Sequence, residues 1–142
     1  MSQHEISVVR DQFEAVNERD FQRAMDLYAE DVTLIASESS GPKAGTYRGK
    51  EAVGEWFGDW FRSFGSDYHF EIEEARELTG GLIFLFATHG GSGRASGVEV
   101  SGENAYLYRV RDGKVSNVGF FFSRDEALEA VSLPEWSGAE TD

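Results

Sequence analysis

The sequence predicts an α+β domain, with helices gathered early in the chain and antiparallel strands later. Two patterns indicate this class. Up to about residue 64, many apolar residues recur every three or four positions, as on amphipathic helices. From about residue 68 they alternate with polar residues, as on strands with one buried face.

The first helix is indicated by Ile6, Val9, Phe13 and Val16, and Asp20 can cap a second, short one. The segment GKEAVGEWFGDWFRSF then predicts a third, strongly amphipathic helix. Its apolar positions lie three or four residues apart: Val53, Trp56, Phe57, Trp60, Phe61 and Phe64. On a helical wheel, Gly54 and Gly58 fall elsewhere, among polar neighbours.

An early strand over Val32 to Ser37 precedes the third helix. After that helix, Tyr68, Phe70 and Ile72 begin the alternating pattern, and the run from Leu82 to Ala87 is apolar on both faces. The motif Ser123-x-x-Glu126 predicts a last short helix through Val131.

The segment ENAYLYRVRDGKVSNVGFFF predicts a β-hairpin, and its turn has two readings. A two-residue turn at Asp112-Gly113 would pair Arg111 with Lys114, whereas a type I turn followed by a glycine bulge would pair Val110 with Lys114. We prefer the second, because it gathers the aromatic residues on one face: Tyr106, Tyr108, Phe120 and Phe122. A slip of one residue would exchange the two faces.

A length of 142 residues indicates a single domain with a core of its own. We expect it to span residues 1–133, followed by a flexible tail over 134–142, where no pattern is visible. The net charge of −13 repels phosphate backbones and anionic lipids, so we expect neither nucleic acid nor membrane as a partner. A polar N-terminus and the lack of apolar runs of ~20 residues favour a cytoplasmic protein.

The absence of Cys excludes disulfides and thiolate catalysis. Three scattered His residues predict no metal site. The glycine-rich GGSGRASG leads from strand to strand, whereas a phosphate-binding loop precedes a helix. We therefore expect no cofactor.

Four segments in this order resemble the SnoaL-like domains of the nuclear transport factor 2-like superfamily: FEAVNERDFQRAMDLYAEDVTL, GTYRGKEAVGEWF, YRVRDGKV and SRDEALEAVSL. The resemblance covers residues from about 6 to 133. It implies a cone-shaped barrel, in which a strongly bent antiparallel sheet wraps around three N-terminal helices and a short C-terminal helix follows. It also implies an apolar pocket inside the cone and a homodimer joined through the outer sheet face.

The resemblance and the preferred hairpin register together predict the lining of this pocket, although most of these residues could simply fill the core. The expected ligand-binding residues are Phe13, Tyr28, Trp56, Phe57, Trp60, Phe86, Thr88, Phe120 and Phe122, together with Tyr106 and Tyr108. The same alignment turns His89 outward, and a bulge at Gly90-Gly91 would turn it back inward.

The residues that catalyse known reactions in this superfamily are mostly missing. In the ketosteroid isomerase pattern, the base position falls on Ala36, one donor near Gln12 and the acid donor on Tyr106, so a steroid isomerase is disfavoured. The final strand, VGFFF, lacks the aspartate of limonene epoxide hydrolases. The candidate catalytic residues that remain are Tyr106 and Tyr108 as hydrogen-bond donors, with Glu103 or His89 as a base.

Two functions follow as expectations. The first is a SnoaL-like pocket protein for an apolar small molecule. It could be a cofactor-independent isomerase, cyclase or hydrolase that acts by acid–base chemistry on a carbonyl-bearing or polycyclic substrate. The alternative is a non-catalytic ligand-binding or dimeric assembly module. A hollow cone favours the first, and a filled cone favours an assembly module.

Overall fold

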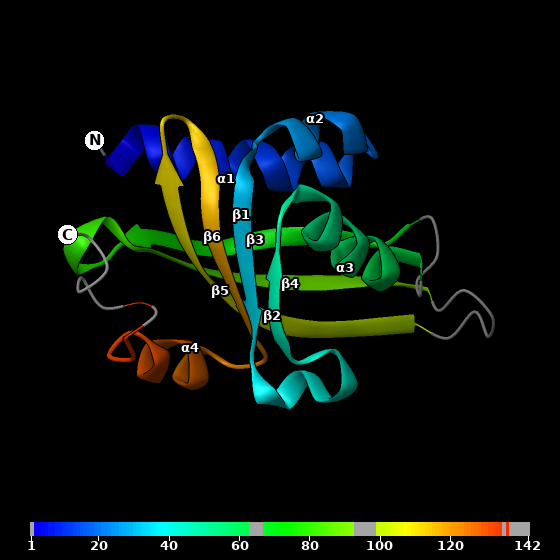
Figure 1. Ribbon diagram of the computed structural model, residues 1–142. Coiled ribbons are helices and arrows are strands. Elements are labelled where there is room, and N and C mark those ends of the chain that lie inside the picture. The colour runs from blue at the N-terminus through cyan, green and yellow to red at the C-terminus, as the bar shows by residue number, and fades with distance from the viewer. Residues whose placement is uncertain (1, 63–66, 93–98, 135, 137–142) are drawn as a thin grey trace.

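The computed structural model describes residues 2–62, 67–92, 99–134 and 136. Three helices lie on the concave face of one bent sheet: α1 (Ser2–Asn17), α2 (Phe21–Asp26) and α3 (Lys50–Arg62) (Figure 1). A fourth helix, α4 (Arg124–Ala130), packs on the opposite face. This is the predicted α+β class, with three N-terminal helices and a short C-terminal one. Phe64, expected in the third helix, lies outside the described residues.

The sheet has six strands in the order β2-β1-β6-β5-β4-β3. Their bounds are β1 (Tyr28–Ala36), β2 (Gly45–Arg48), β3 (His69–Glu77), β4 (Ile83–Ser92), β5 (Glu99–Arg111) and β6 (Lys114–Phe121), with short 3-10 turns at Glu38–Lys43 and Thr79–Gly81. Neighbours are antiparallel except β1 and β6, which are parallel. The sheet is therefore mixed. It is also open, since β2 and β3 lie at its two edges and the β5–β6 hairpin lies between β1 and β4.

The predicted caps are present at two helices. The side chain of Asp20 accepts a hydrogen bond from the backbone N–H of Arg23 at the start of α2. The hydroxyl of Ser123 accepts one from the backbone N–H of Glu126 at the start of α4. Among the described helices, none combines the length and the apolar character needed to cross a membrane.

The β5–β6 hairpin has the turn that we did not prefer and the faces that we did. Arg111 pairs with Lys114, so the loop is Asp112-Gly113, both with positive φ, as in a mirror-image hairpin turn. The three-residue turn was therefore wrong. Beyond the turn, however, a β-bulge at Ser116 shifts the register by one residue. Because of this shift, Tyr106, Tyr108 and Phe120 lie on the same inward face, as expected.

Side chains on the two faces of the sheet form two separate clusters. The inward cluster contains Tyr106, Tyr108 and Phe120. The outer cluster contains Leu107 and Phe121, covered by α4 and Trp136. Part of the outer face that was expected to form a dimer contact is therefore covered by the chain itself.

The C-terminal segment is anchored at Trp136. This side chain is only 2% exposed, and its backbone oxygen accepts a hydrogen bond of 2.8 Å from Arg109. A Cβ at Gly119 would lie 2.7 Å from the indole, so glycine makes room for the ring on β6. Of the expected flexible tail, Trp136 thus packs on the sheet, and residues 137–142 lie outside the described residues.

Removing residues 134–142 should lower the free energy of unfolding by about 3 kcal/mol, because losing a buried tryptophan side chain costs roughly that much. Removing only 137–142 keeps Trp136 and should change it by less than about 0.5 kcal/mol. Urea denaturation followed by circular dichroism measures both. Equal losses in the two truncations, or no loss in either, would contradict this role for Trp136.

Candidate ligand-binding site

A cavity of about 380 Å³ lies between the three N-terminal helices and the concave face of the sheet. We call it the tyrosine cavity. Helices α1 to α3 and the strands β1, β3 and β5 contribute its lining: Gln12, Phe13, Val16, Phe21, Ala24, Met25, Tyr28, Gly54, Phe57, Gly58, Phe61, Arg62, Phe70, Tyr106 and Tyr108. The part of the cone that the structure describes is therefore hollow.

Helix α3 borders the cavity with a stripe of residues three or four positions apart. Two of them are Phe57 and Phe61, and the other two are Gly54 and Gly58. The glycines were expected elsewhere on the helix, so that expectation was wrong. A Cβ at Gly54 would come within 2.9 Å of the end of the Met25 side chain, so glycine lets α2 approach α3 closely.

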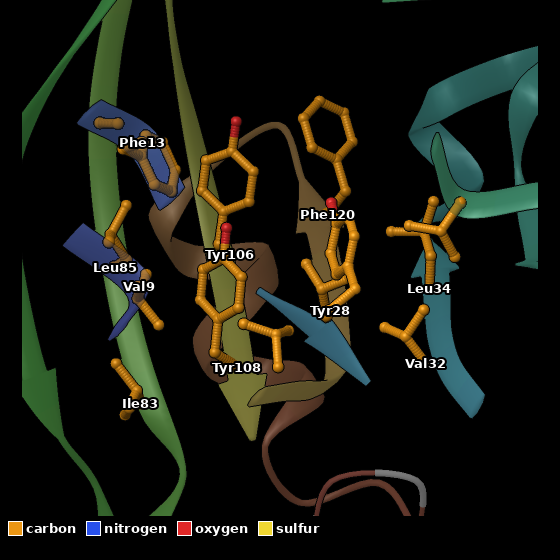
Figure 2. Packing of buried hydrophobic residues seen from close by; sticks show 14 of the residues in the cluster. Val9, Phe13, Tyr28, Val32, Leu34, Ile83, Leu85, Tyr106, Tyr108 and Phe120 are labelled. Atoms are coloured by element: carbon orange, nitrogen blue, oxygen red, sulfur yellow. The ribbon is translucent and has the colours of Figure 1, made fainter. Parts of the chain in front are cut away.

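Five predicted pocket residues do line the tyrosine cavity: Phe13, Tyr28, Phe57, Tyr106 and Tyr108. Figure 2 shows the rings of Tyr106 and Tyr108 one above the other on β5, with Phe13 on one side and Tyr28 and Phe120 on the other. The two tyrosine rings are 5.9 Å apart and nearly parallel, whereas Phe13 meets Tyr106 edge-on at 5.3 Å. This packing holds both tyrosines in fixed orientations.

The cavity contains three tyrosine hydroxyls, those of Tyr28, Tyr106 and Tyr108. Burial raises the pKa of each, so all three stay neutral at physiological pH and can donate a hydrogen bond. Within the described part of the chain, no group hydrogen-bonds to these hydroxyls. The amide nitrogen of Gln12, by contrast, already donates to the backbone oxygen of Ala24 at 2.9 Å.

The described lining contains no carboxylate and no imidazole, and its one charged side chain, Arg62, pairs with Asp59. No three metal-ligating side chains gather anywhere in the described residues. The tyrosine cavity can therefore donate hydrogen bonds to an uncharged ligand, but its described walls supply no base.

Four other predicted pocket residues face inward without lining the cavity: Trp56, Trp60, Phe120 and Phe122. Trp56 and Phe120 are buried, with their rings 5.0 Å apart. Phe122 lies at the edge of this group, 38% exposed. These aromatic residues fill the core between α3 and the sheet, as the simpler reading of the sequence allowed.

The faces of β4 are the reverse of those expected. Ile83, Leu85 and Ala87 belong to the inward cluster, and Figure 2 shows Ile83 and Leu85 on the side of the sheet that carries Tyr106 and Tyr108. Phe84 belongs to the outer cluster. Because side chains alternate along a strand, Phe86 and Thr88 also point outward.

Three predicted site residues lie outside the tyrosine cavity: Phe86, Thr88 and Glu103. Thr88 and Glu103 instead border a second hollow, together with His69, His89, Gly90 and Gly102. The ring of Phe86 lies 4.6 Å from the guanidinium of Arg124 on the outer face. The hydroxyl of Thr88 donates to a carboxylate oxygen of Glu73 at 3.2 Å. Glu103 is exposed and lies opposite Thr88 across the β4–β5 ladder.

The same alternation turns His89 inward. Its Nδ1 lies 2.8 Å from the hydroxyl oxygen of Tyr68, which also accepts a hydrogen bond of 2.7 Å from the indole N–H of Trp60. Which of the two groups donates in the hydrogen bond between Tyr68 and His89 depends on the tautomer of the imidazole. A Cβ at Gly102 would lie 2.9 Å from Nε2, so glycine makes room for the ring.

Two buried polar residues on the inward face were not among the predicted site residues, Tyr68 and Asn104. Tyr68 begins the alternating pattern that the sequence shows, and Asn104 precedes Tyr106 by two positions, so the period of two indicates the face of both.

Burial lowers the pKa of His89 below the ordinary 6.5 that it has in the unfolded chain. Well above pH 6.5 the ring is neutral in both states, and pH has no effect on stability through it. Below that value the unfolded chain takes up the proton first, so the free energy of unfolding falls until the pH passes the folded pKa.

The substitution His89→Gln should remove this dependence. The stability of the wild type should decrease relative to that of the variant between about pH 7.5 and pH 5.5. Urea denaturation across this range tests it. A difference between the two proteins that stays constant, or changes in the other direction, would contradict a buried neutral His89.

Comparisons with solved structures place this geometry among known folds. TerC, co-crystallised with polyporic acid, superposes with a TM-score of 0.71 at 19% identity over 89% of this chain and 96% of that one. RV0760c from Mycobacterium tuberculosis, in complex with estradiol-17beta-hemisuccinate, gives 0.67 at 20% identity over 83% and 92%. A protein with a ketosteroid isomerase-like fold from Catenulispora acidiphila DSM 44928, in complex with trimethylamine, gives 0.67 at 20% identity over 92% and 96%.

At such identities the likeness shows the fold alone. A comparison with curated proteins finds no match. The family model for the SnoaL-like domain, however, matches residues 9–118, well over half of the chain. The chain therefore belongs to the SnoaL-like domain family, which confirms the resemblance seen in its sequence.

Proposed function

We propose that the protein binds an apolar small molecule of bicyclic to polycyclic size, with a carbonyl group, in the tyrosine cavity. The observation that carries this proposal is the set of three neutral hydroxyls, of Tyr28, Tyr106 and Tyr108, in a lining that is mostly apolar. A carbonyl oxygen can accept more than one hydrogen bond, and a buried hydroxyl without a partner is costly. A ketone or quinone oxygen would satisfy two of these donors at once.

The comparisons support a ligand of this kind. TerC and RV0760c have the same fold and were crystallised with ring compounds, polyporic acid and a steroid hemisuccinate. A volume of about 380 Å³ is within the range of natural small-molecule pockets.

Tetralone, a bicyclic ketone, and tetralin, the same hydrocarbon without the oxygen, form a matched pair of probes. Tyr106→Phe should weaken tetralone binding about five- to tenfold, because one hydrogen bond is lost, and change tetralin binding by less than about twofold. Isothermal titration calorimetry measures both affinities.

Tyr47→Phe is the matched control, because the hydroxyl of Tyr47 donates to the backbone oxygen of Lys43 outside the cavity. It should leave both affinities unchanged. The proposal fails if the wild type binds neither probe, or if it binds both equally and Tyr106→Phe has no effect.

A second candidate is a cofactor-independent enzyme of isomerase, cyclase or hydrolase type, and one observation favours it. His89 is an inward-facing imidazole held by the hydroxyl of Tyr68, and a neutral imidazole can act as a general base. Because His89 lies outside the lining of the tyrosine cavity, this reaction requires a substrate that extends from the cavity to the hollow bordered by His89. With Nδ1–H donated to Tyr68, Nε2 would remove a proton next to the carbonyl, while tyrosine hydroxyls stabilise the oxyanion that forms.

Exchange of the hydrogens next to the tetralone carbonyl in heavy water, followed by proton NMR, tests this activity. An enzyme of this type should accelerate the exchange over buffer, and His89→Gln should lower the acceleration about a hundredfold, as expected for loss of a general base. No acceleration by the wild type would leave ligand binding as the function. Full activity of His89→Gln would exclude His89 as the base.

We also propose a homodimer whose contact uses only part of the outer sheet face. Since α4 and Trp136 cover the outer face of β5 and β6 and of β4 around Phe84, the contact would use β3 and the end of β4 near Thr88. Glu71, Glu73 and Glu103 are exposed there, so their repulsion would make such a dimer weaker at low ionic strength.

A further inference from the structure

The tyrosine cavity has a buried end and an exposed end. Tyr106 and Tyr108, on the sheet, are only 2% and 3% exposed, whereas Phe21 on α2 is 47% exposed. The side chain of Arg62, the last residue of α3, is 65% exposed and also lines the cavity. Phe21 and Arg62 therefore border the mouth through which a ligand can enter.

Arg62 lies on the same side of α3 as the two glycines of the lining. Gly54, Gly58 and Arg62 follow one another at intervals of four residues, so they extend along about 12 Å of the helix on one side. Side chains of a helix lean toward its N-terminus. The guanidinium accordingly lies over Gly58, where a Cβ would be 3.3 Å from Nη1. The positive charge is thus held at the mouth of the cavity.

The charges around the mouth suit an anionic group. Arg62 is the one charged side chain of the described lining, which contains no carboxylate. The guanidinium of Arg19 lies 5.4 Å from the ring centre of Phe61, which also lines the cavity. An anion at this position would therefore meet positive charge, although the whole chain has a net charge of −13.

Arg62 has a partner that an anion could replace. It pairs with Asp59, which also accepts a hydrogen bond of 3.4 Å from the ammonium group of Lys43. Both members of the Arg62–Asp59 pair are more than half exposed, and such exposed ion pairs are weak. If Arg62 turned to a ligand, Asp59 would keep Lys43 as its partner.

We propose that Arg62 binds a carboxylate on the ligand whose carbonyl the tyrosine hydroxyls hold, so this inference rests on the proposed function. A guanidinium can donate two parallel hydrogen bonds to one carboxylate. The uncharged ring system would occupy the apolar interior, and the charge would stay at the mouth, where water reaches it. The ligand class is therefore a ring ketone with an acidic side chain.

The probes are a tetralone with a propionic acid side chain on its aromatic ring and the methyl ester of that acid, which share the ketone and differ in charge at neutral pH. The wild type should bind the acid more tightly than the ester. Arg62→Gln should weaken binding of the acid about fivefold and change binding of the ester by less than about twofold. Calorimetric titration measures both affinities.

Arg48→Gln is the matched control, because Arg48 is an exposed residue of β2 outside the described lining. It removes the same charge and should change neither affinity. Equal weakening of both probes by Arg62→Gln would overturn the proposal, since that indicates altered packing. An equal effect of Arg48→Gln and Arg62→Gln on the acid would overturn it too, since that indicates net charge alone.

Asp59→Asn provides a second readout, because it removes a charged partner of Arg62. This substitution should strengthen binding of the acid about two- to threefold and leave the ester unchanged. In combination with Arg62→Gln, the gain should disappear. A gain of the same size without Arg62 would mean that Asp59 acts by general repulsion, and would contradict an exchange of partners at Arg62.

The two proposals can fail separately. If the wild type binds the ester at least as tightly as the acid, or if Arg62→Gln keeps the preference for the acid, only the role of Arg62 is wrong. If the wild type binds neither probe, the proposed function fails and the role of Arg62 fails with it.

Discussion

The pairing of β5 with β6 decides which side chains of this sheet meet the helices. A two-residue turn at Asp112-Gly113 alone would set one register, and the bulge at Ser116 shifts it by one residue. With the bulge, Tyr106 and Tyr108 face the helices. Without it, residues of one strand would change faces relative to the other, and the aromatic cluster could not form on one side.

The tyrosine cavity follows from that register together with the composition of α3. On this helix Trp56 packs against Phe120, whereas Gly54 and Gly58 line the cavity. Three tyrosine hydroxyls from the cavity lining have no hydrogen-bond partner among the described residues. Core packing alone would favour phenylalanine at these positions. The places where a sequence departs from its own packing rules are often functional, which is why we assign them to a ligand.

Much of this arrangement could be predicted from the sequence, wherever polar and apolar residues alternate clearly. The helix period identified Phe13 and Phe57, and the alternation of Tyr106 and Tyr108 with polar or smaller neighbours identified their face. The wrong turn did not change the predicted faces of the two strands. Turn and bulge together shift the predicted register by an even number of residues, and an even shift keeps each side chain on its face. Local sequence does not show a bulge such as that at Ser116.

Where polar and apolar residues do not alternate, the predicted faces of the side chains were wrong. The run from Leu82 to Ala87 is apolar on both sides, because α4 covers its outer face, so no pattern distinguished Phe86 from Leu85. His89 was assigned to the wrong side for the same reason. Trp136 stands alone in a segment without a period, and only the tertiary contact with Gly119 and Arg109 reveals its place.

The central claim is that neutral tyrosine hydroxyls in the cavity hydrogen-bond to a ligand carbonyl. The infrared stretching band of the carbonyl of bound tetralone tests this most directly. The account predicts a band shifted to lower frequency than in a hydrocarbon solvent, with part of that shift lost in Tyr106→Phe. A band at the hydrocarbon position, in a complex shown by titration to be saturated, would contradict it.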